Sequence, residues 1–561
     1  MSDLLVVIPM WVALLVAAGA LAVLPRTLGY AVAVALSALT VPWVLLAPAG
    51  TSLVVTPLGF EQTLLRVDGL TRPVTAVFGF VAALGLAYAY ATDADRKTGA
   101  WAAAYMGASM AAVLAGDWLT LLVAWETMAV TATVLVWVHG GDAVRPAYRY
   151  AVYHLIAGAL LVAAVALHFT AQGTFAITGG FTAGLPTALG VLGVGINLGF
   201  VGLHYWVPDT YPRPHVAASV VLAGFTTKVA VYALARLIPE GNLVVAYVGG
   251  VTVVYAVWMA ILQTDTRRLL SYHIVSQVGY MVAAVGIGTA VGTAGAVAHL
   301  STHVLYKGLL FMVAGAFVYR VGTGSLKELG GLGRRMPLTF AAFLVAALAI
   351  SGVPGFSGFV SKGLVIKAVD KTGLEVLWWL LVLGGVGTVL SFAKFGYYAF
   401  VRAVPAPFEV RPSRPALSAV LVVAAVPSVV FGLAPDLLFG AMPGDTAGFE
   451  PYATSELTKA AAVTAVGVLG FVALRGPLSR IPDRDVDRVL HPAAFRLADG
   501  ASRAVAGTAG TVAKTAGVFA RSLGDRLLAR STDGPAESAI GTAMLVVAAG
   551  LGLTLLVALL G

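Results

Sequence analysis

The chain has 561 residues, of which 59% are hydrophobic and only 11% are charged. This balance excludes an ordinary soluble domain and is typical of a membrane protein. The sequence contains no cysteine, which excludes disulfides, thiolate-bound iron–sulfur clusters and thioether-attached haem in this chain.

Apolar stretches long enough to cross a bilayer recur along the whole sequence. A spanning helix needs about 20 apolar residues, and the chain contains sixteen such stretches, at 4–24, 29–47, 71–92, 99–116, 118–138, 150–170, 187–206, 216–237, 244–262, 269–290, 293–319, 338–366, 375–401, 415–434, 457–474 and 538–560. The first stretch has no basic residues before it, so we interpret it as a retained helix and not as a signal peptide. We therefore predict an all-α polytopic membrane protein with about 16 transmembrane helices.

The basic residues are distributed unevenly between the loops. Sixteen spans place successive loops alternately on two faces, and one face carries 25 of the 35 lysines and arginines while the other carries six. The positive-inside rule makes the first face cytoplasmic and puts both termini outside, as in a multi-pass plasma-membrane protein. The net charge of +9 is thus explained by topology, and no nucleic-acid partner is predicted.

The four remaining basic residues lie inside predicted spans, and all are lysines: Lys228, Lys307, Lys362 and Lys394. Outside the spans the chain has 25 arginines against six lysines. An ammonium group can release its proton in a protein, whereas a guanidinium group does not. Four lysines without an arginine favour a proton path, and lysines that extend from helix ends to the interface are the alternative.

Other ionisable groups in the spans favour the same interpretation. Glu126 is the only acid deep in a span, and a partner is expected for it. In "HLSTHVLYK", His299, His303 and Lys307 follow one another at intervals of four residues and share one helix face, which suits a water-linked relay. A metal site is the alternative, disfavoured because no carboxylate or cysteine lies close by in sequence. Three further histidines are auxiliary candidates, although lone histidines usually serve packing: His154, His204 and His273.

An internal repeat accounts for two of the lysines. The pattern K-x-x-x-Y-A-x-x-R begins at Lys228 and again at Lys394, 166 residues later. A weaker match pairs Tyr153-His154 with Tyr306-Lys307. Both fit two units of five helices, spans 4–8 and 9–13. Because five is odd, the second unit starts on the opposite face, and the repeats are inverted, as in many secondary transporters.

Proline and glycine interrupt two spans at corresponding places in the two units. The twelfth span contains Pro354, Gly355 and Gly358 just before Lys362, which predicts a broken helix because freed backbone groups need other partners in a membrane. Its counterpart, the seventh span, contains Gly199 and Gly202. A merely kinked helix is the alternative for both.

Four segments, "LHYWVPDTY", "TDTRRLLSYHIVSQVGYM", "HLSTHVLYKGLLF" and "SGVPGFSGFVSK", closely resemble the antiporter-like subunits of complex I, membrane-bound hydrogenases and Mrp-type cation/proton antiporters. The resemblance covers roughly residues 70–435 and is greatest to the D-type subunits of Mrp antiporters. It implies relay roles for residues that match the family's fifth-, eighth-, eleventh- and twelfth-helix positions, namely Glu126, Lys228, His299, His303, Lys307 and Lys362. Asn197 departs from the pattern, because the family usually has a lysine there, paired with the glutamate.

The resemblance implies a proton-translocating subunit of a multisubunit Na+/H+ antiporter, without a cofactor or a redox centre of its own. Its expected partners are other membrane subunits, H+, Na+ and the lipid bilayer. A proton-pumping subunit of a complex I-like quinone oxidoreductase, hydrogenase or inorganic-carbon uptake complex is the alternative. A subunit that has lost pumping is a third hypothesis, which retention of four membrane lysines disfavours.

We predict six parts along the chain. Residues 477–536 carry Arg496, Arg503, Lys514 and Arg521 on one helical face, which indicates an amphipathic segment on the cytoplasmic side; a disordered connector is the alternative. The parts are three N-terminal spans (1–98), the first repeat (99–238), the second repeat (239–402), spans 14 and 15 (403–476), the amphipathic segment (477–536) and a final span (537–561).

Overall fold

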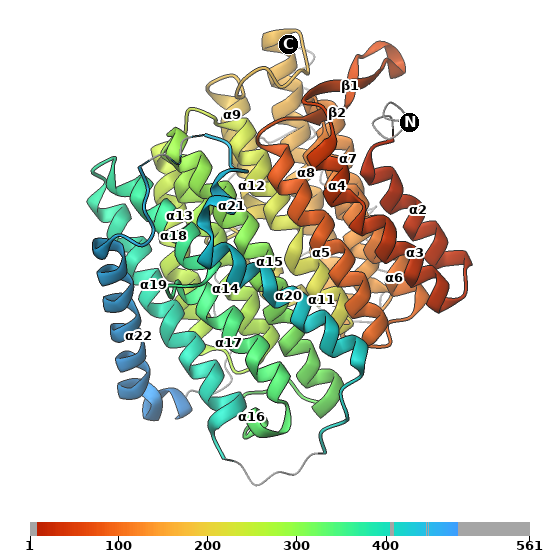
Figure 1. The fold of residues 1–561 in the computed structure, drawn as a ribbon. Helices are drawn as coiled ribbons and strands as arrows, with labels where there is room; N and C mark the ends of the chain where they lie inside the picture. Colours follow the sequence, from red (N-terminus) through yellow and green to blue (C-terminus); the bar gives the residue numbers. More distant parts are fainter. Residues whose placement is uncertain (1–7, 404–408, 445, 447, 481–561) are drawn as a thin grey trace, which may run out of the picture. The chain divides into compact units, whose positions relative to one another are not determined.

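The structure, a computed structural model, describes residues 8–403, 409–444, 446 and 448–480. Helices pass repeatedly up and down through this part of the chain (Figure 1). They are α2 (Met10–Val23), α3 (Arg26–Ala38), α4 (Thr40–Leu46), α5 (Thr71–Ala91), α6 (Arg96–Leu114), α7 (Trp118–Trp137), α8 (Val144–Gln172), α9 (Leu185–Leu198), α10 (Trp206–Thr210), α11 (Val216–Gly224), α12 (Thr226–Leu237), α13 (Leu243–Leu262), α14 (Thr266–Gly286), α15 (Ala290–Val321), α16 (Leu332–Arg335), α17 (Pro337–Ser351), α18 (Ser357–Asp370), α19 (Glu375–Gly396), α20 (Pro415–Leu433), α21 (Pro435–Phe439) and α22 (Thr454–Arg480).

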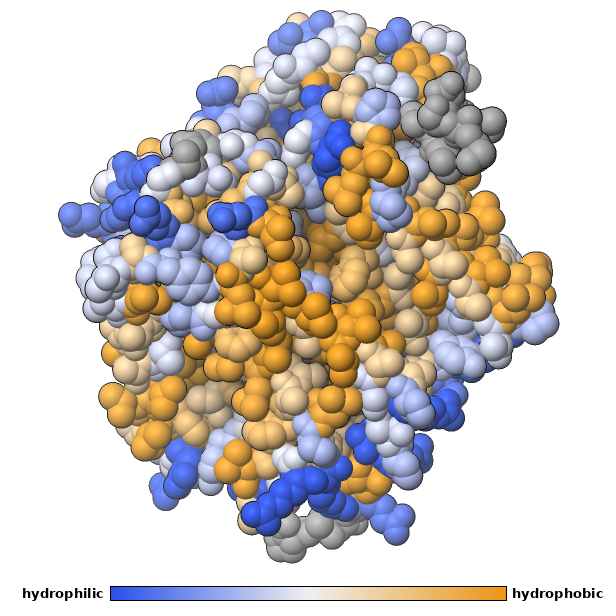
Figure 2. Space-filling view, in the orientation of Figure 1, coloured by the Kyte–Doolittle hydropathy of each residue, from blue (hydrophilic) through white to orange (hydrophobic). Residues whose placement is uncertain are grey.

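The predicted helical membrane architecture is confirmed. By length and composition, 11 helices of the described part can cross a membrane, and three shorter apolar helices accompany them. Each of the first fifteen predicted spans coincides with a helix or a pair of helices. Hydrophobic side chains gather over the middle of the surface and hydrophilic ones over its two ends (Figure 2). The sixteenth predicted span and the amphipathic segment beyond Arg480 lie outside the described residues.

A two-stranded sheet was not anticipated from the sequence. Strand β1 (Gly50–Val55) pairs antiparallel with β2 (Gln62–Val67), joined by the short helix η1 (Pro57–Gly59). The strands follow the helices α3 and α4 and lead into α5. Thr63 of β2 contacts the start of α7, since its N–H donates to the Asp117 carboxylate and its carbonyl accepts the N–H of Gly116. The hairpin therefore fixes one end of α7.

Polar side chains define where several helices begin. Asp95, Asp117, Asn242, Asp265 and Thr289 each precede a helix and accept a backbone N–H of its first turn. Such caps satisfy donors that have no partner inside the helix. Each cap lies beside a membrane-spanning stretch, so the helix ends are fixed where the apolar sequence stops.

Both predicted helix breaks are present. Helix α9 ends at Gly199 and α17 ends at Gly352, each with a φ of 74°, a conformation that side chains other than glycine rarely adopt. Pro354 and Gly355 lie between α17 and α18, and Gly358 lies in the first turn of α18. Gly202 follows the first break with a φ of 90°. The interruption is complete at both places, so the kinked-helix alternative is wrong.

A third break divides the eighth predicted span, which the sequence analysis treated as continuous. Helices α11 and α12 meet at Phe225, whose φ and ψ of −115° and −70° depart from helical values. The hydroxyl of Tyr105 accepts the N–H of Thr226 at 2.8 Å. A side chain of α6 thus satisfies a backbone donor that the break has freed, as a membrane interior requires.

The same interactions recur in the two five-helix units. Asp117 forms an isolated β-bridge with Ala176, and Asp265 forms one with Ser325; each aspartate caps the second helix of its unit. Arg236 lies over the ring of Tyr232 at 5.1 Å, and in the second unit the guanidinium of Arg402 lies 4.9 Å from its tyrosine ring. These equivalences support the inverted repeat, although the boundaries of the six parts stay predictions.

Loops assigned to one face contact one another. On the more basic face, Arg414 forms a 2.6 Å ion pair with Asp93, and Arg26 donates to the carbonyl of Ala94. On the other face, Arg66 donates to the carbonyl of Ile177. Arg236 bonds within the less basic face, to Asp68, whereas Arg402 bonds carbonyls of the more basic one. The repeat-related arginines thus lie at opposite ends of the bundle.

Candidate functional site

The four membrane lysines share one arrangement: each donates to backbone carbonyls while its side chain is buried. Lys228, in the first turn of α12, donates to the carbonyl of Ala223 at 2.6 Å and to the hydroxyl of Thr227 at 3.1 Å. Ala223 lies in the last turn of α11, where carbonyls lose their helical partners. The unpredicted break therefore creates the binding place of the Lys228 ammonium group.

Helix ends hold two of the other lysines as well. Lys362 donates to the carbonyl of Ile350 at 2.5 Å, in the last turn of α17. Lys394 donates to the carbonyls of Ile261 and Gln263 at the end of α13, at 2.7 and 2.6 Å. The C-terminal end of a helix carries partial negative charge and favours a cation. The ammonium groups are thus stabilised without a carboxylate.

Lys307 is placed differently, in the middle of α15. Its ammonium nitrogen lies 3.4 Å from the carbonyl oxygen of Leu270, on α14, and 5.9 Å from the centre of the Phe392 ring. The longer distance means a weaker hydrogen bond than those of the other three lysines. Lys307 is therefore the least firmly held of the four.

Hydroxyl groups connect α15 to α18 beside Lys362. The Nδ1 atom of His299 lies 3.0 Å from the hydroxyl of Ser361, which lies 2.7 Å from the hydroxyl of Thr302. The ring of His303 is centred 6.2 Å from that of His299. This network joins the predicted histidine face to the residue that precedes Lys362.

Several fully buried polar atoms around this network have no hydrogen-bond partner among the described residues. They include both ring nitrogens of His303, the side-chain amide of Gln277 and the hydroxyl of Tyr306. Buried polar groups in proteins are nearly always satisfied, and ordered water is the usual partner where protein atoms are lacking. The interior between α14 and α15 is therefore suited to hold water.

The charges of the central groups act on one another. His303 lies within electrostatic range of Lys228, Lys307 and Lys362. Lys307 is in turn influenced by Lys228 and by Lys362. The arrangement extends from α12 across α15 to α18, so the structure brings together the eighth-, eleventh- and twelfth-helix residues selected from the sequence.

Glu126 is not joined to this arrangement. Its side chain is half-buried on α7, and its Oε1 atom has no hydrogen-bond partner among the described residues. The carboxylate lies against Gly158 of α8, where an added Cβ would collide with it. Neither Lys228 nor His154, the two partners considered from sequence, forms an ion pair or hydrogen bond with Glu126 in the described part of the chain; the Nδ1 atom of His154 bonds the carbonyl of Tyr150 instead.

The auxiliary candidates have separate surroundings. Asn197 is fully buried, and neither its amide nitrogen nor its oxygen has a partner among the described residues. The ring of His204 packs 5.0 Å from that of Tyr255. His273, in contrast, bonds the hydroxyl of Ser391 through Nε2 at 2.8 Å and lies within range of the charges of Lys307 and Lys362. Of the auxiliary residues, His273 is the one that reaches the central lysines.

Sequence reasoning missed the hydroxyl groups that support these residues. Tyr105, Thr226, Thr302, Ser361 and Ser391 all lie inside apolar helices and contact the lysines or histidines or the break between them. Serine and threonine in a helix can bond their own backbone, so their positions alone do not reveal a network. Gly224 within an apolar span was the one available signal for the third break.

No group of three or more histidine, aspartate or glutamate side chains that could hold a metal occurs in the described ranges. Asp117, the second acid considered as a cation ligand, accepts the N–H groups of Thr63 and Thr120 and the Thr120 hydroxyl. Its carboxylate is occupied with capping a helix.

Comparison with known proteins agrees with this geometry. Residues 115–391 match the family described as "NADH:quinone oxidoreductase/Mrp antiporter, TM". The chain is 32% identical over 309 residues to the D-type subunit of the Na(+)/H(+) antiporter of Alkalihalophilus pseudofirmus, covering 52% of this chain and 62% of that protein. It is 31% identical over 332 residues to the L-type subunit of the NADH-quinone oxidoreductase of Mycobacterium tuberculosis, covering 55% and 52%. Both matches span less than two thirds of the relative.

The fold has a counterpart among solved structures. A chain of the Mrp complex from Dietzia sp. DQ12-45-1b superposes with a TM-score of 0.67 at 23% identity, over 84% of this chain and 96% of that chain. At this identity the likeness concerns the fold. Together with the family match across α7 to α19 and the lysines at the helix breaks, it identifies the chain as a member of the antiporter-like family of proton-translocating membrane subunits that Mrp antiporters and NADH:quinone oxidoreductases share.

Proposed function

We propose that the chain is the proton-translocating subunit of a multisubunit Mrp-type Na+/H+ antiporter. The observation that carries this proposal is the set of buried lysines held by helix-end carbonyls, with histidine nitrogens between them that lack protein partners among the described residues. Ionisable groups inside a membrane are costly and mark ion pathways. A path along Lys228, His303, Lys307 and Lys362, with Lys394 near the far end, uses all the membrane lysines.

Proton movement follows from the coupling of these charges. When Lys228 gains a proton, its charge disfavours a second proton on the neighbouring Lys307, and loss of that proton towards Lys362 favours reloading. Water at the unpartnered nitrogens of His303 would connect the steps. The carbonyls at the helix ends receive each ammonium group and release the neutral amine, because only the cation gains from the helix-end charge.

The coupling ion and the partners come from the relatives. The relative from Alkalihalophilus pseudofirmus is named as part of a Na(+)/H(+) antiporter, which supports Na+ and small membrane subunits as partners. The second candidate is a proton-pumping subunit of a quinone oxidoreductase, favoured by the 31% identity to the relative from Mycobacterium tuberculosis. Purification of the native complex separates them, since the second candidate requires iron–sulfur subunits. Under either candidate this chain acts as a transporter subunit without its own redox centre.

The orientation belongs to the same proposal. We infer a plasma-membrane location with the loops around Arg26, Arg414 and Arg402 in the cytoplasm and the N-terminus outside. Because the chain has no cysteine, single cysteines introduced at Asp93 and at Glu240 would react from opposite sides with a membrane-impermeant thiol reagent. Labelling of both from the same side contradicts the orientation.

The relay is tested by Na+-dependent ΔpH in everted vesicles that contain the whole complex. Lys228→Ala and Lys362→Ala are expected to lose exchange, because each removes a proton carrier without a substitute. Lys371→Ala, on the exposed turn after α18, is the matched control and should exchange normally. Full exchange by either of the first two variants rules out the relay.

A further inference from the structure

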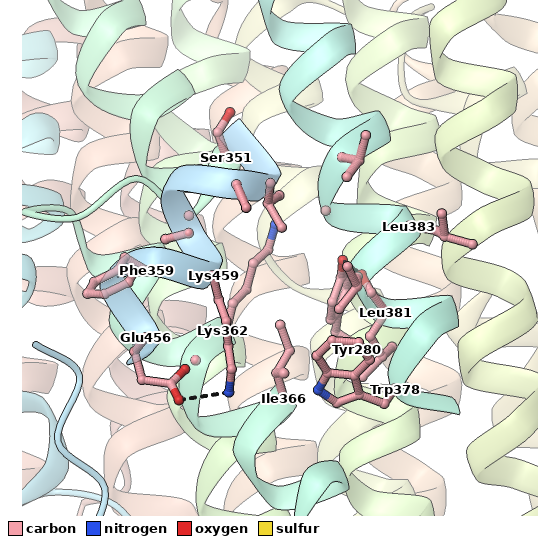
Figure 3. A pocket seen from close by; sticks show the side chains of 18 of the residues that line it. Tyr280, Ser351, Phe359, Lys362, Ile366, Trp378, Leu381, Leu383, Glu456 and Lys459 are labelled. Atoms are coloured by element: carbon pink, nitrogen blue, oxygen red, sulfur yellow. Dashed lines mark hydrogen bonds and ion pairs between the residues drawn. The ribbon is translucent and has the colours of Figure 1, made fainter. Parts of the chain in front are cut away.

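A pocket of about 410 Å³ lies beside Lys362, between α14, α18, α19 and α22. Figure 3 shows Glu456 and Lys459 of α22 on one side of it, and Tyr280 and Trp378 on the other, with the Lys362 side chain between them. Helix α22 is beyond the segment that matches the family, which ends at residue 391. Nothing in the family match therefore assigns a role to its charged residues.

Glu456 is the only carboxylate among the residues that line this pocket. Its side chain is 12% exposed and accepts a hydrogen bond from Lys459 at 3.0 Å, whereas Lys459 is 41% exposed. The glutamate lies in the first turn of a helix long and apolar enough to cross the membrane. A carboxylate in such a place is costly unless it serves a purpose.

The pocket connects Lys362 with Glu456. At one end it is lined by Ser351 and Gly352, which directly follow Ile350, the residue whose carbonyl holds the Lys362 ammonium group. Lys362 also lies 5.1 Å from the centre of the Tyr280 ring, on the pocket wall. At about 30 Å³ for each water molecule, the volume has room for on the order of ten waters. Five polar or charged side chains line it and can bind them: Tyr280, Ser351, Lys362, Glu456 and Lys459.

We propose that Glu456 is the proton acceptor through which Lys362 discharges, with Lys459 as its positioning residue. This rests on the proposed function, because it assigns the exit of that same pathway. The proton leaves the Lys362 ammonium group, crosses pocket water and binds the Glu456 carboxylate. It then passes to bulk water at the end of the bundle where α22 begins. Lys362 is left as the neutral amine, and Glu456 returns to the carboxylate.

Lys459 explains how Glu456 is prepared for the next proton. The ion pair keeps Glu456 charged while it waits, and the pair is neutral as a whole. The partly exposed lysine can move its ammonium group towards the membrane surface when Glu456 is protonated. The less basic face, where α22 starts, is then the side on which protons are released.

Transport by matched variants tests the role of the carboxylate. In vesicles that contain the whole complex, Glu456→Gln is expected to lower the exchange rate roughly tenfold or more, as removal of a proton-transfer group usually does. Glu456→Asp should retain most of the rate, and Lys459→Met should change the pH profile of exchange while the complex still assembles. Glu450→Gln, on the exposed stretch before α22, is the control and should be normal.

The outcomes separate this proposal from the proposed function. Normal exchange by Glu456→Gln together with loss of exchange by Lys362→Met overturns the role of Glu456 and leaves the pathway in place. Normal exchange by Lys362→Met overturns the pathway itself. If Glu456→Gln prevents assembly, the decision passes to Lys459→Met: an unchanged pH profile overturns the proposal.

The content of the pocket is tested independently, because the chain offers a background free of cysteine. Val463→Cys lies on the pocket wall, and Leu469→Cys lies farther along α22 on its exposed surface, away from the pocket. Thiol reagents attack the thiolate, which forms only where water is present, so a small charged reagent should modify Val463→Cys much faster than Leu469→Cys. Equal, slow modification of both means that lipid fills the pocket, which overturns the water-mediated transfer.

Discussion

The two repeats present the same helix pattern but differ in what lies inside it. The first unit, α6 to α12, is broken in two places and holds one lysine, Lys228, with Asn197 buried and Glu126 unpaired among the described residues. The second unit, α13 to α19, is broken once and holds three lysines together with the histidine and hydroxyl network. The scaffold is therefore repeated, whereas the ionisable groups are concentrated in the second unit.

This difference separates fold from conduction. Glycines, aspartate caps and the tyrosine–arginine pairs recur because they set the ends and breaks of helices in both units. The groups that carry protons are free to differ, since each needs only water and a neighbouring charge. We therefore expect transport to depend steeply on the second unit and shallowly on the outer part of the first.

The largest effect is expected from Lys307, which links the two units. Lys307→Met removes the group that responds to both Lys228 and Lys362, so exchange should fall by roughly a hundredfold or more, in the range of essential proton-transfer groups. The measurement is the initial rate of Na+-dependent ΔpH in vesicles with equal amounts of the assembled complex. Lys327→Met, in the loop after α15, is the control. A rate within twofold of the wild type contradicts the idea that the units are coupled through Lys307.

Glu126 should have a smaller effect, because no bond in the described structure joins it to the lysines. Glu126→Gln is expected to lower the exchange rate by about two- to fivefold, less than a central relay group would. Gly158→Ala gives a second way to disturb it, since the new Cβ would collide with the carboxylate. The flexible end of the glutamate can move, so this variant should assemble and reproduce the rate of Glu126→Gln.

Gly179→Ala serves as the control for that pair, because no atom lies within 4 Å of its added Cβ. A loss of transport by Glu126→Gln as large as that of Lys307→Met means that the first unit carries protons from its outer helices. The contrast between the units is then smaller than their side chains indicate.

Asn197 tests the contrast in the other direction. Asn197→Ala removes an amide that has no protein partner in the described structure, so exchange should change by less than about twofold, and the melting temperature of the purified complex should shift by only a few degrees. Asn197→Gln, which keeps the amide, is the comparison. A strong loss with Asn197→Ala that Asn197→Gln restores shows that the amide, through water, takes the place of the usual lysine.

The sequence contained enough to predict the spans, the two breaks and the central lysines, because each depends on local composition. Twenty apolar residues predict a span, and the glycines at 199 and 352 are required by the backbone there. The break at Phe225 was not predictable in the same way, since it is stabilised by Tyr105, more than a hundred residues earlier. Glu456 was overlooked for a related reason, because only the packing of α22 brings it to the pocket with Lys362.

The expected partner of Glu126 shows the limit of reasoning from a motif. A buried acid implies a cation nearby, and both candidates were chosen because they are the basic residues of adjacent helices. The structure leaves the carboxylate half-buried against a glycine instead. Sequence gives the helix and the face of such a residue, but the side on which it meets water, lipid or another subunit depends on the assembled complex.

The smallest effect concerns the arginines that end the two repeats. Arg236 of the first unit forms a 2.6 Å ion pair with Asp68, whereas Arg402 of the second bonds three backbone carbonyls, which do not titrate. Burial raises the pKa of Asp68, but the opposing effects of Arg236, the Thr71 N–H and Arg66 outweigh it and lower the pKa to about 2. The folded state thus favours the carboxylate, and its contribution is complete above about pH 4 and lost as the pH falls towards 2.

Asp68→Asn should therefore lower the stability of the purified complex by about 1–2 kcal/mol at neutral pH, the pKa shift being discounted for the partly exposed side chain. The difference in melting temperature between wild type and variant should shrink between pH 5 and pH 3, because only the wild type loses the ion pair. Glu61→Gln, on the nearby exposed turn, is the control and should follow the wild type. A difference that stays constant with pH means that Asp68 acts through its hydrogen bonds to the start of α5, and that the two repeat ends are held in the same way.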